Sequence, residues 1–272
     1  MMKILLSTYN GAPYLPELLA SLEAQTYQDW KLCVRDDGST DNSVEILQKF
    51  QQDHSDHVEI IQDEEGNIGS YQSYMRLLKS ADSDYIVFCD QDDVWMPNKI
   101  ELSVAKINEL EKLHGKNLPL LIFTDLQAVD KDLKTIHPSF WQYQKLNPEI
   151  AYDWKKLLAQ NVITGCTILM NQEAKKVCLP APLYCILPDH WIGVQVSKYG
   201  KVGFISTPTL LYRQHGNNVA GVHQFGYRYV LGKLKDIIQI IDAYKTFALY
   251  YGDITVWELI TLKISLNLKR LL

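Results

Sequence analysis

The chain has 272 residues, of which 47% are hydrophobic and 22% are charged. This is an ordinary globular composition, and the chain is long enough for one large α/β domain or two small ones. The apolar content, with only 14 glycines and 10 prolines, excludes a disordered chain and a collagen-like fibre. The net charge of −5 provides no basic field, so we expect no nucleic-acid partner. A bound anion would need a local device such as a metal ion.

The cysteines indicate a reduced, cytoplasmic protein. They number five and form no CxxC pair, so they resemble neither a disulfide framework nor a zinc site. Cys33 and Cys89 lie in apolar runs and are expected to be buried. The apolar run at the N-terminus is too short for a signal peptide, and no stretch is long and uncharged enough to span a bilayer.

Strands and helices are predicted to alternate along the first hundred residues. Short apolar runs that end in turn residues predict strands, and leucines at helical spacing after Pro13 predict the first helix. The expected strands are residues 3–7, 30–35, 58–62 and 84–89; the expected helices begin at Pro13, cover 43–50 and end at Lys79. This rhythm predicts an α/β fold, with a mainly parallel sheet and helices on both faces.

The pattern becomes less regular after a helix that is expected to follow Lys99. Residues 131–152 have no clear period and are predicted to be irregular. Strands are expected at 118–123, at 162–170 with an interruption at Gly165, and at 201–206 and 209–212. Apolar residues return at helical spacing from Tyr227 onward and again over 254–272, which predicts C-terminal helices.

Acidic clusters follow two of the predicted strands, Asp36-Asp37 after the second and Asp90-Gln91-Asp92-Asp93 after the fourth. In open α/β sheets ligands bind at the carboxyl ends of the strands. An Asp-x-Asp pair there suits Mg²⁺ or Mn²⁺ holding a nucleoside diphosphate. A solvated acidic turn is the alternative. A phosphatase with an aspartyl nucleophile is disfavoured, because Val94 stands where that family has threonine.

Four ordered motifs together resemble family 2 glycosyltransferases. They are Ser7-Thr8-Tyr9-Asn10, Asp36-Asp37-Gly38-Ser39-Thr40-Asp41, Asn67-Ile68-Gly69, and Asp90-Gln91-Asp92-Asp93 with Trp95 and Pro97 behind it. The resemblance is close over about the first hundred residues and continues to about Gly221. It implies the Rossmann-like GT-A fold, transfer with inversion, and a GT-A domain at 1–221. That domain would comprise a nucleotide-sugar half at 1–100 and an acceptor half at 101–221, followed by a helical extension at 222–272.

The resemblance also implies the donor site, with Mn²⁺ or Mg²⁺ as cofactor. Asp92 would ligate the metal that bridges the two phosphates. The implied nucleotide-binding residues are Thr8, Tyr9, Asn10, Asp36, Asp37, Asn67, Gly69, Asp90 and Gln91. One departure is clear: Ser73-Tyr74-Met75 stands where many relatives have Ala-Arg-Asn, with Arg76 just beyond.

The second half would supply the chemistry. In Pro188-Asp189-His190-Trp191 the resemblance makes Asp189 the general base, which takes the proton of the acceptor hydroxyl. His190 and Trp191 would lie at the donor or acceptor, with Trp191 stacked on a sugar face, and Gly165 would face the donor sugar. Structural alternatives stay open: Gly165 as a strand bulge, Asp189 as a helix cap and Trp191 as a core residue.

The segment from Tyr212 to Gly221 is the most distinctive run of the second half. Arg213 would hold a phosphate, and His215 would complete the metal or diphosphate site. Together with the Asp-Gln-Asp-Asp-Val-Trp run, the sequence of this segment resembles most closely that of bacterial rhamnosyltransferases of surface polysaccharide synthesis. This implies a TDP-linked donor such as TDP-rhamnose, or a UDP-linked one, and a saccharide or lipid-linked saccharide acceptor.

The C-terminal helices have two interpretations. Their aromatic and aliphatic residues, with Lys263, Lys269 and Arg270, suit peripheral contact with the inner face of the plasma membrane. An apolar helix pair is, however, more often part of a core or of a homodimer interface. Two other functions also remain open. A nucleotidyltransferase would normally carry a glycine-rich basic loop after the first strand, which is missing here, and a non-catalytic module would bind nucleotide or saccharide without turnover.

Overall fold

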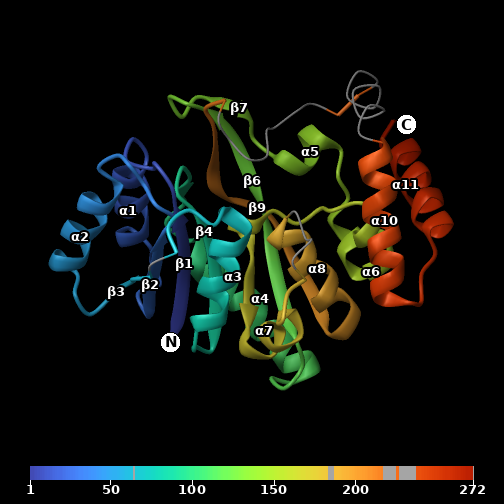
Figure 1. Ribbon diagram of the computed structural model, residues 1–272, viewed down its shortest axis with the longest axis horizontal. Coiled ribbons are helices and arrows are strands. Elements are labelled where there is room, and N and C mark those ends of the chain that lie inside the picture. The colour runs from blue at the N-terminus through green and yellow to red at the C-terminus, as the bar shows by residue number, and fades with distance from the viewer. Residues whose placement is uncertain (64, 183–186, 217–224, 227–236, 272) are drawn as a thin grey trace.

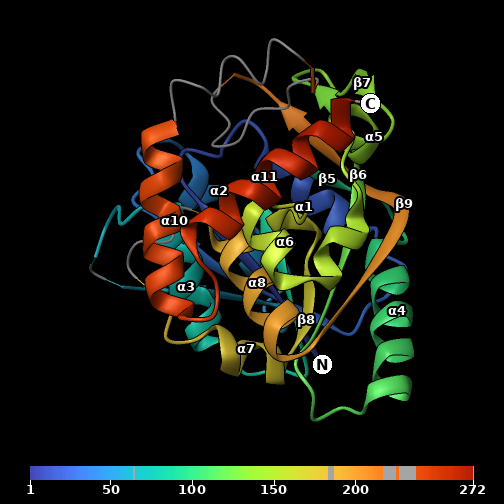
Figure 2. The same ribbon diagram turned by 90° about the vertical axis from the view of Figure 1, so that its right-hand side faces the viewer.

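The computed structural model describes residues 1–63, 65–182, 187–216, 225–226 and 237–271. Within these residues a nine-stranded mixed sheet runs through the centre of the molecule, with helices packed on both of its faces (Figures 1 and 2). The predicted α/β class is therefore confirmed. The predicted domain boundary at residue 221 lies outside the described residues.

The first half of the sheet is parallel. The central strand β1 (Met2–Thr8) pairs with β2 (Trp30–Asp36) on one side and β4 (Tyr85–Asp90) on the other, and β3 (Val58–Ile61) lies beyond β2. All four strands point the same way, so the polar residues that follow them gather at one edge of the sheet, the upper edge in Figure 1.

The second half of the sheet is mixed. The short strand β8 (Leu169–Asn171) pairs antiparallel with both β4 and β6 (Leu120–Asp130), and so joins the two halves. Beyond it, β6 and β9 (Lys201–Gln214) are parallel to each other. Two small strands, β5 (Val94–Trp95) and β7 (Thr135–His137), pair antiparallel with β9 and β6 respectively.

Two hydrophobic cores lie on the two sheet faces, because alternate side chains of each strand point to opposite sides. Ile4 and Leu6 of β1 pack in one core and Leu5 in the other. The Ile4 side is covered by α1 (Leu15–Glu23), α2 (Ser43–Asp53) and α4 (Lys99–His114). The Leu5 side is covered by α3 (Ser70–Ser80), α6 (Trp154–Ala159), α7 (Gln172–Cys178) and α8 (Pro188–Tyr199).

The second half corrects several sequence predictions. Residues 131–152 are not irregular, since they form β7, α5 (Phe140–Gln144) and the 3-10 helix η1 (Pro148–Tyr152). Residues 162–170 do not form an interrupted strand: Gly165 begins a 3-10 turn, η2 (Gly165–Thr167), and only the following residues join the sheet as β8. The two strands expected at 201–206 and 209–212 are one strand, β9, because its register shift against β6 absorbs Pro208.

The C-terminal segment forms α10 (Ile237–Tyr251) and α11 (Val256–Leu271), which lie beside α6 at the right of Figure 1. The part of the predicted helix at 227–236 lies outside the described residues. No described helix combines the length and apolar character needed to span a membrane. Cys33 and Cys89 are buried and free, as expected.

Candidate active site

A pocket of about 450 Å³ opens at the edge of the sheet where the parallel strands end. Its lining comes from both halves of the chain. The predicted site residues that line it are Tyr9, Asp37, Asn67, Gly69, Asp90, Gln91, Asp92, Gly165, Asp189 and His215. Motifs that are far apart in the sequence therefore meet at one site.

The residues after β1 and β2 build a rigid wall of this pocket. The Asp37 carboxylate accepts hydrogen bonds from buried Arg35 (2.5 Å) and from the backbone N–H groups of Ile68 (2.9 Å) and Gly69 (2.8 Å). Gly69, at φ +84°, adopts a left-handed conformation that favours glycine. Asp37 thus fixes the Asn67-Ile68-Gly69 turn against the strand end.

Three predicted nucleotide-binding residues shape the wall without lining the pocket. Thr8 is buried and donates to Gln91 Oε1 (2.7 Å). Asn10 Oδ1 accepts from the backbone N–H of Thr40 (2.8 Å), and Asp36 Oδ2 accepts from the backbone N–H of Ser39 (2.8 Å). In this structure their polar atoms hold the loops together.

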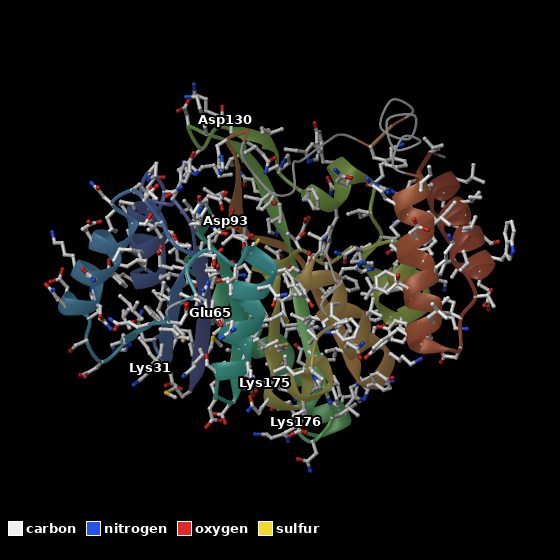
Figure 3. All side chains as sticks on the ribbon, viewed as in Figure 1. Lys31, Glu65, Asp93, Asp130, Lys175 and Lys176 are labelled. Carbon is white, nitrogen blue, oxygen red and sulfur yellow. The ribbon has the colours of Figure 1, made fainter. Side chains whose placement is uncertain are left out.

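Asp90 is the last residue of β4, and Asp92 and Asp93 lie in the loop that follows it. Figure 3 shows Asp93 well above Lys175 and Lys176, which lie toward the lower side of the molecule. Asp92 Oδ2 lies 2.7 Å from His215 Nε2, and both side chains are mostly buried, with 14% and 10% exposed. Burial and the charge of Asp92 raise the pKa of Asp90 to about 6. Asp92 and His215, which are 123 positions apart in sequence, therefore form a carboxylate–imidazole pair at the pocket.

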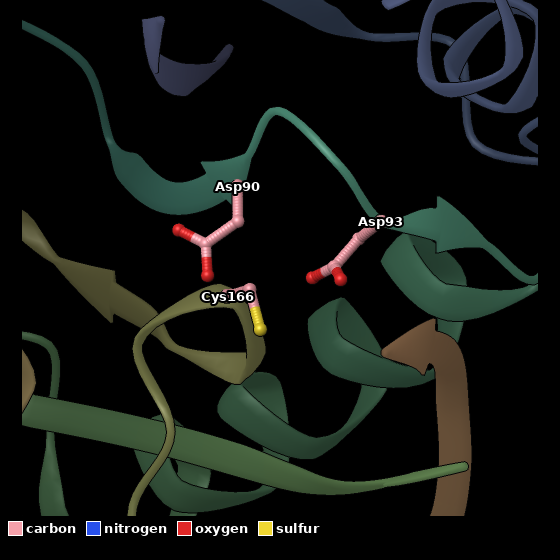
Figure 4. A group of neighbouring side chains, drawn as sticks. All are labelled: Asp90, Asp93 and Cys166. Carbon is pink, nitrogen blue, oxygen red and sulfur yellow. The ribbon is translucent and has the colours of Figure 1, made fainter. Parts of the chain in front are cut away.

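A second cluster lies beneath this loop. Asp90, Asp93 and Cys166 each offer a ligand-type atom within 4.8 Å of the others (Figure 4). Burial raises the pKa of the Cys166 thiol well above its ordinary value, which keeps it protonated. The buried ammonium of Lys99 lies 4.7 Å from the centre of the Trp95 ring. Burial lowers the pKa of Lys99 to about 8, and the nearby Asp93 and Asp90 act in the opposite direction. This cluster thus already has a cationic group of the protein close by.

Asp189, the second residue of α8, lines the same pocket. Its carboxylate accepts from the backbone N–H of His190 (2.7 Å) and, weakly, from Asn161 Nδ2 (3.4 Å). Burial raises the pKa of Asp189 to about 6, with the charge of Asp90 acting in the same direction. A methyl group on Gly165 would lie 3.6 Å from Asp189 Cβ, an ordinary van der Waals contact, so Gly165 is a direct neighbour of Asp189 in the pocket.

Three predicted donor or acceptor residues do not line the pocket. The expected stacking of Trp191 on a sugar is wrong, because its indole is buried in the core and donates to the carbonyl oxygen of Cys178 (2.9 Å). His190 Nε2 lies 3.0 Å from the carbonyl oxygen of Leu157, and burial lowers the His190 pKa to about 4. Arg213 is buried and bonded to protein groups, which corrects its predicted role in holding phosphate.

Two residues that contact the site carboxylates were missed from the sequence. The Tyr74 hydroxyl lies 2.8 Å from Asp90 Oδ1 and 2.7 Å from the carbonyl oxygen of Cys89, whereas Arg76 pairs with Glu65 at the surface. The available signal was the position of Tyr74, which stands where many members of the resembled family have arginine. Asn161 begins the glycine-containing run before η2, but nothing in its sequence context indicated a contact with Asp189.

Comparisons with known proteins agree with this geometry. Residues 3–116 match the family described as "Glycosyl transferase family 2". The chain is 26% identical over 233 residues to the dTDP-rhamnosyl transferase RfbG of Shigella flexneri, covering 80% of this chain and 74% of that protein. It is 30% identical over 149 residues to an uncharacterized glycosyltransferase of Nostoc, covering 54% of this chain but only 43% of the relative.

Solved structures show the same fold. TarS 1–349 of S. aureus in complex with UDP-GlcNAc superimposes with a TM-score of 0.63 at 17% identity, covering 99% of this chain and 72% of that one. The mannosyltransferase PcManGT of Pyrobaculum calidifontis, in complex with GDP-Man and Mn²⁺, gives a TM-score of 0.57 at 16% identity, covering 90% of this chain and 63% of that one. The expected similarity to GT-A glycosyltransferases is confirmed.

Proposed function

We propose that this chain, whose residues 3–116 match glycosyl transferase family 2, is a metal-dependent, inverting glycosyltransferase. In this proposal a sugar passes from a nucleoside-diphosphate donor to an acceptor hydroxyl. One observation carries it: a single pocket is lined by the Asp92–His215 pair and by Asp189. Such a transfer needs a site that neutralises the diphosphate and a base; Asp92 and His215 would supply the first and Asp189 the second.

The donor set of Asp92 and His215 fits a divalent cation. Carboxylate and imidazole ligands suit Mn²⁺, and the two side chains already lie in contact at the pocket surface. A bound cation would offset the charge that develops on the departing diphosphate. The Mn²⁺ bound in the PcManGT complex supports the same cofactor class, with Mg²⁺ as the alternative.

Asp189 is the proposed general base. It accepts the proton of the acceptor hydroxyl as that oxygen bonds to the anomeric carbon, and the bond from this carbon to the diphosphate oxygen breaks. The electron pair leaves with the diphosphate, and attack from the opposite face inverts the carbon. A pKa of about 6 leaves Asp189 mostly ionised at neutral pH while making it a stronger base than an exposed carboxylate.

The proposed donor is a TDP-linked sugar, with rhamnose as the first to test. The similarity to the dTDP-rhamnosyl transferase of S. flexneri supports this assignment, and UDP-linked sugars are the next class. The proposed acceptor is a saccharide or lipid-linked saccharide.

We also propose that the chain is divided into a GT-A domain at 1–221, with halves at 1–100 and 101–221, and an extension at 222–272. The exposed side chains of Leu249, Trp257 and Leu268 in this extension would contact a membrane surface or a second copy.

The decisive experiment measures nucleoside diphosphate released from TDP-rhamnose, other TDP-sugars, UDP-sugars and GDP-sugars, each with Mn²⁺, Mg²⁺ or EDTA. We expect slow, metal-dependent hydrolysis of one donor, because water can replace the acceptor. Asp92→Ala should reduce this rate by at least about 100-fold. The matched control is Asp82→Ala, which removes an exposed carboxylate and should change nothing.

Two results would contradict the proposal. Equal turnover in EDTA would exclude the metal. Tight binding of TDP or UDP without turnover of any donor, even when saccharide acceptors are supplied, would favour a binding module instead.

A further inference from the structure

A buried arginine connects the first helix to the proposed metal site. Arg213, near the end of β9, donates from Nε to the carbonyl oxygen of Asp92 (2.9 Å) and from Nη1 to that of Lys131 (2.9 Å). Its remaining guanidinium nitrogen pairs with the carboxylate of Glu17, in the first turn of α1. Only 4% of the Arg213 side chain is exposed, so its orientation is fixed by these groups.

Tyr14 completes the same connection. Its ring stacks on the imidazole of His215, with 4.7 Å between ring centres and 19° between planes. The Arg213 guanidinium carbon lies 5.2 Å from the centre of the same ring. Tyr14 immediately precedes α1. The start of this helix therefore contacts Arg213 through Glu17 and Tyr14, and contacts His215 through Tyr14. Neither Tyr14 nor Glu17 lines the pocket.

These contacts matter because Asp92 and His215 come from loops far apart in the sequence. The φ of +87° at Gly216 puts a turn directly after His215, so the strand no longer holds the backbone on that side. Fixing a loop backbone costs conformational entropy for every residue that is held. Tyr14 stacks on the imidazole, and Arg213 is bonded to the Asp92 main chain. Both contacts order these loops before a ligand binds, so binding does not have to order them.

Building on the proposed function, we propose that Tyr14 and Glu17 are positioning residues that preorganise Asp92 and His215 for a divalent cation and the donor diphosphate. Glu17 acts through Arg213, which it orients. Tyr14 acts on the imidazole directly by limiting its rotation. Groups that orient metal ligands typically change metal affinity or activity by about 10–100-fold when they are removed.

The test measures Mn²⁺ binding to the full chain by EPR of the free ion, without donor, alongside the kcat and KM of donor hydrolysis. We expect Tyr14→Leu and Glu17→Ala to weaken Mn²⁺ binding by about 10-fold. Tyr14→Phe keeps the ring and should stay within about 2-fold of the wild type. The control is Glu23→Ala, at the other end of α1, where the carboxylate pairs with His54 and not with Arg213.

The outcomes separate this proposal from the one on which it rests. If the wild type neither binds Mn²⁺ nor hydrolyses a donor, the proposed function fails. If the wild type does both and the Tyr14 and Glu17 variants bind Mn²⁺ normally, the positioning role alone is overturned, even where melting temperature falls. Should Tyr14→Leu not fold, the exposed Glu17→Ala still decides the question.

Discussion

The two halves of the chain contribute to the pocket in different ways. Up to about residue 100, Tyr9, Asp37 and Asp90–Asp92 of the lining lie at or just after the ends of parallel strands, and the sheet itself aligns them. Beyond that point the predicted site residues of the lining lie at the start of a 3-10 turn (Gly165), in the first turn of α8 (Asp189) and directly after β9 (His215). We call the side formed by the parallel strand ends the donor wall, after its proposed role; the residues proposed for the chemistry, Asp92, Asp189 and His215, lie in loops or at a helix start.

The two halves also differ in how their carboxylates are used. Asp37 is fully engaged by an arginine and two backbone N–H groups. Asp189 has one good hydrogen bond and one weak one, and its pKa is raised to about 6. A carboxylate with many donors serves as a fixed anchor, whereas a buried carboxylate with few donors binds a proton more readily.

Replacing the proposed base should give the largest effect. Asp189→Asn is expected to reduce kcat by about 10²–10⁴-fold, because the amide cannot take the acceptor proton. Donor affinity, measured by titration with TDP or UDP and Mn²⁺, should stay within about 3-fold, since a base acts only in the transition state. If Asp189→Asn kept near-normal turnover, Asp189 would not be the base, and its role would not differ from that of Asp37.

Protein stability provides the control for this variant. The raised pKa of Asp189 means that the folded state binds its proton more tightly than the unfolded state, so this stabilisation is lost as pH rises through about 6. Asparagine does not ionise. The melting temperature of Asp189→Asn should therefore equal or exceed that of the wild type at pH 7.5 and approach it near pH 4.

An intermediate effect is expected on the donor wall. Tyr74→Phe removes the hydroxyl that lies beside Asp90, and a hydrogen bond to a charged group contributes about 1.5–3 kcal/mol. Donor KM should rise roughly 10-fold with a smaller change in kcat. The matched control is Tyr85→Phe at the other end of β4, whose hydroxyl bonds Asn108 and Glu111 on α4. A fall in kcat alone would place Tyr74 with the chemistry rather than with donor binding.

The smallest expected effect concerns pH. Asn161 donates to the Asp189 carboxylate and so lowers its pKa against the effect of burial. Asn161→Ala should raise that pKa, which moves the acid limb of the kcat/KM–pH profile up by a few tenths of a unit. If the acid limb of Asn161→Ala moved toward lower pH, another group would control it. The same would follow if neither Asn161→Ala nor Asp189→Glu moved this limb.

Much of the donor wall could be predicted from the sequence. Short apolar strands each followed by a polar motif define a parallel sheet, and such a sheet brings Asp37, Asn67 and Asp90 to one edge. The acceptor side was harder to predict. Gly165 and Pro208 have only local signals, which do not distinguish a 3-10 turn from a broken strand, or two strands from one strand with a register shift.

The sequence by itself therefore determined the fold class, the alternation of strands and helices in the first hundred residues and the polar motifs that meet at the pocket, because hydrophobic periodicity and turn residues act locally. Only the tertiary structure decided which polar side chains face the pocket. Trp191 turned into the core and Arg213 toward Glu17, while Tyr74 turned toward Asp90. The physical reason is that a side chain's direction and partners depend on packing between residues far apart in the chain, as the 123 positions between Asp92 and His215 illustrate.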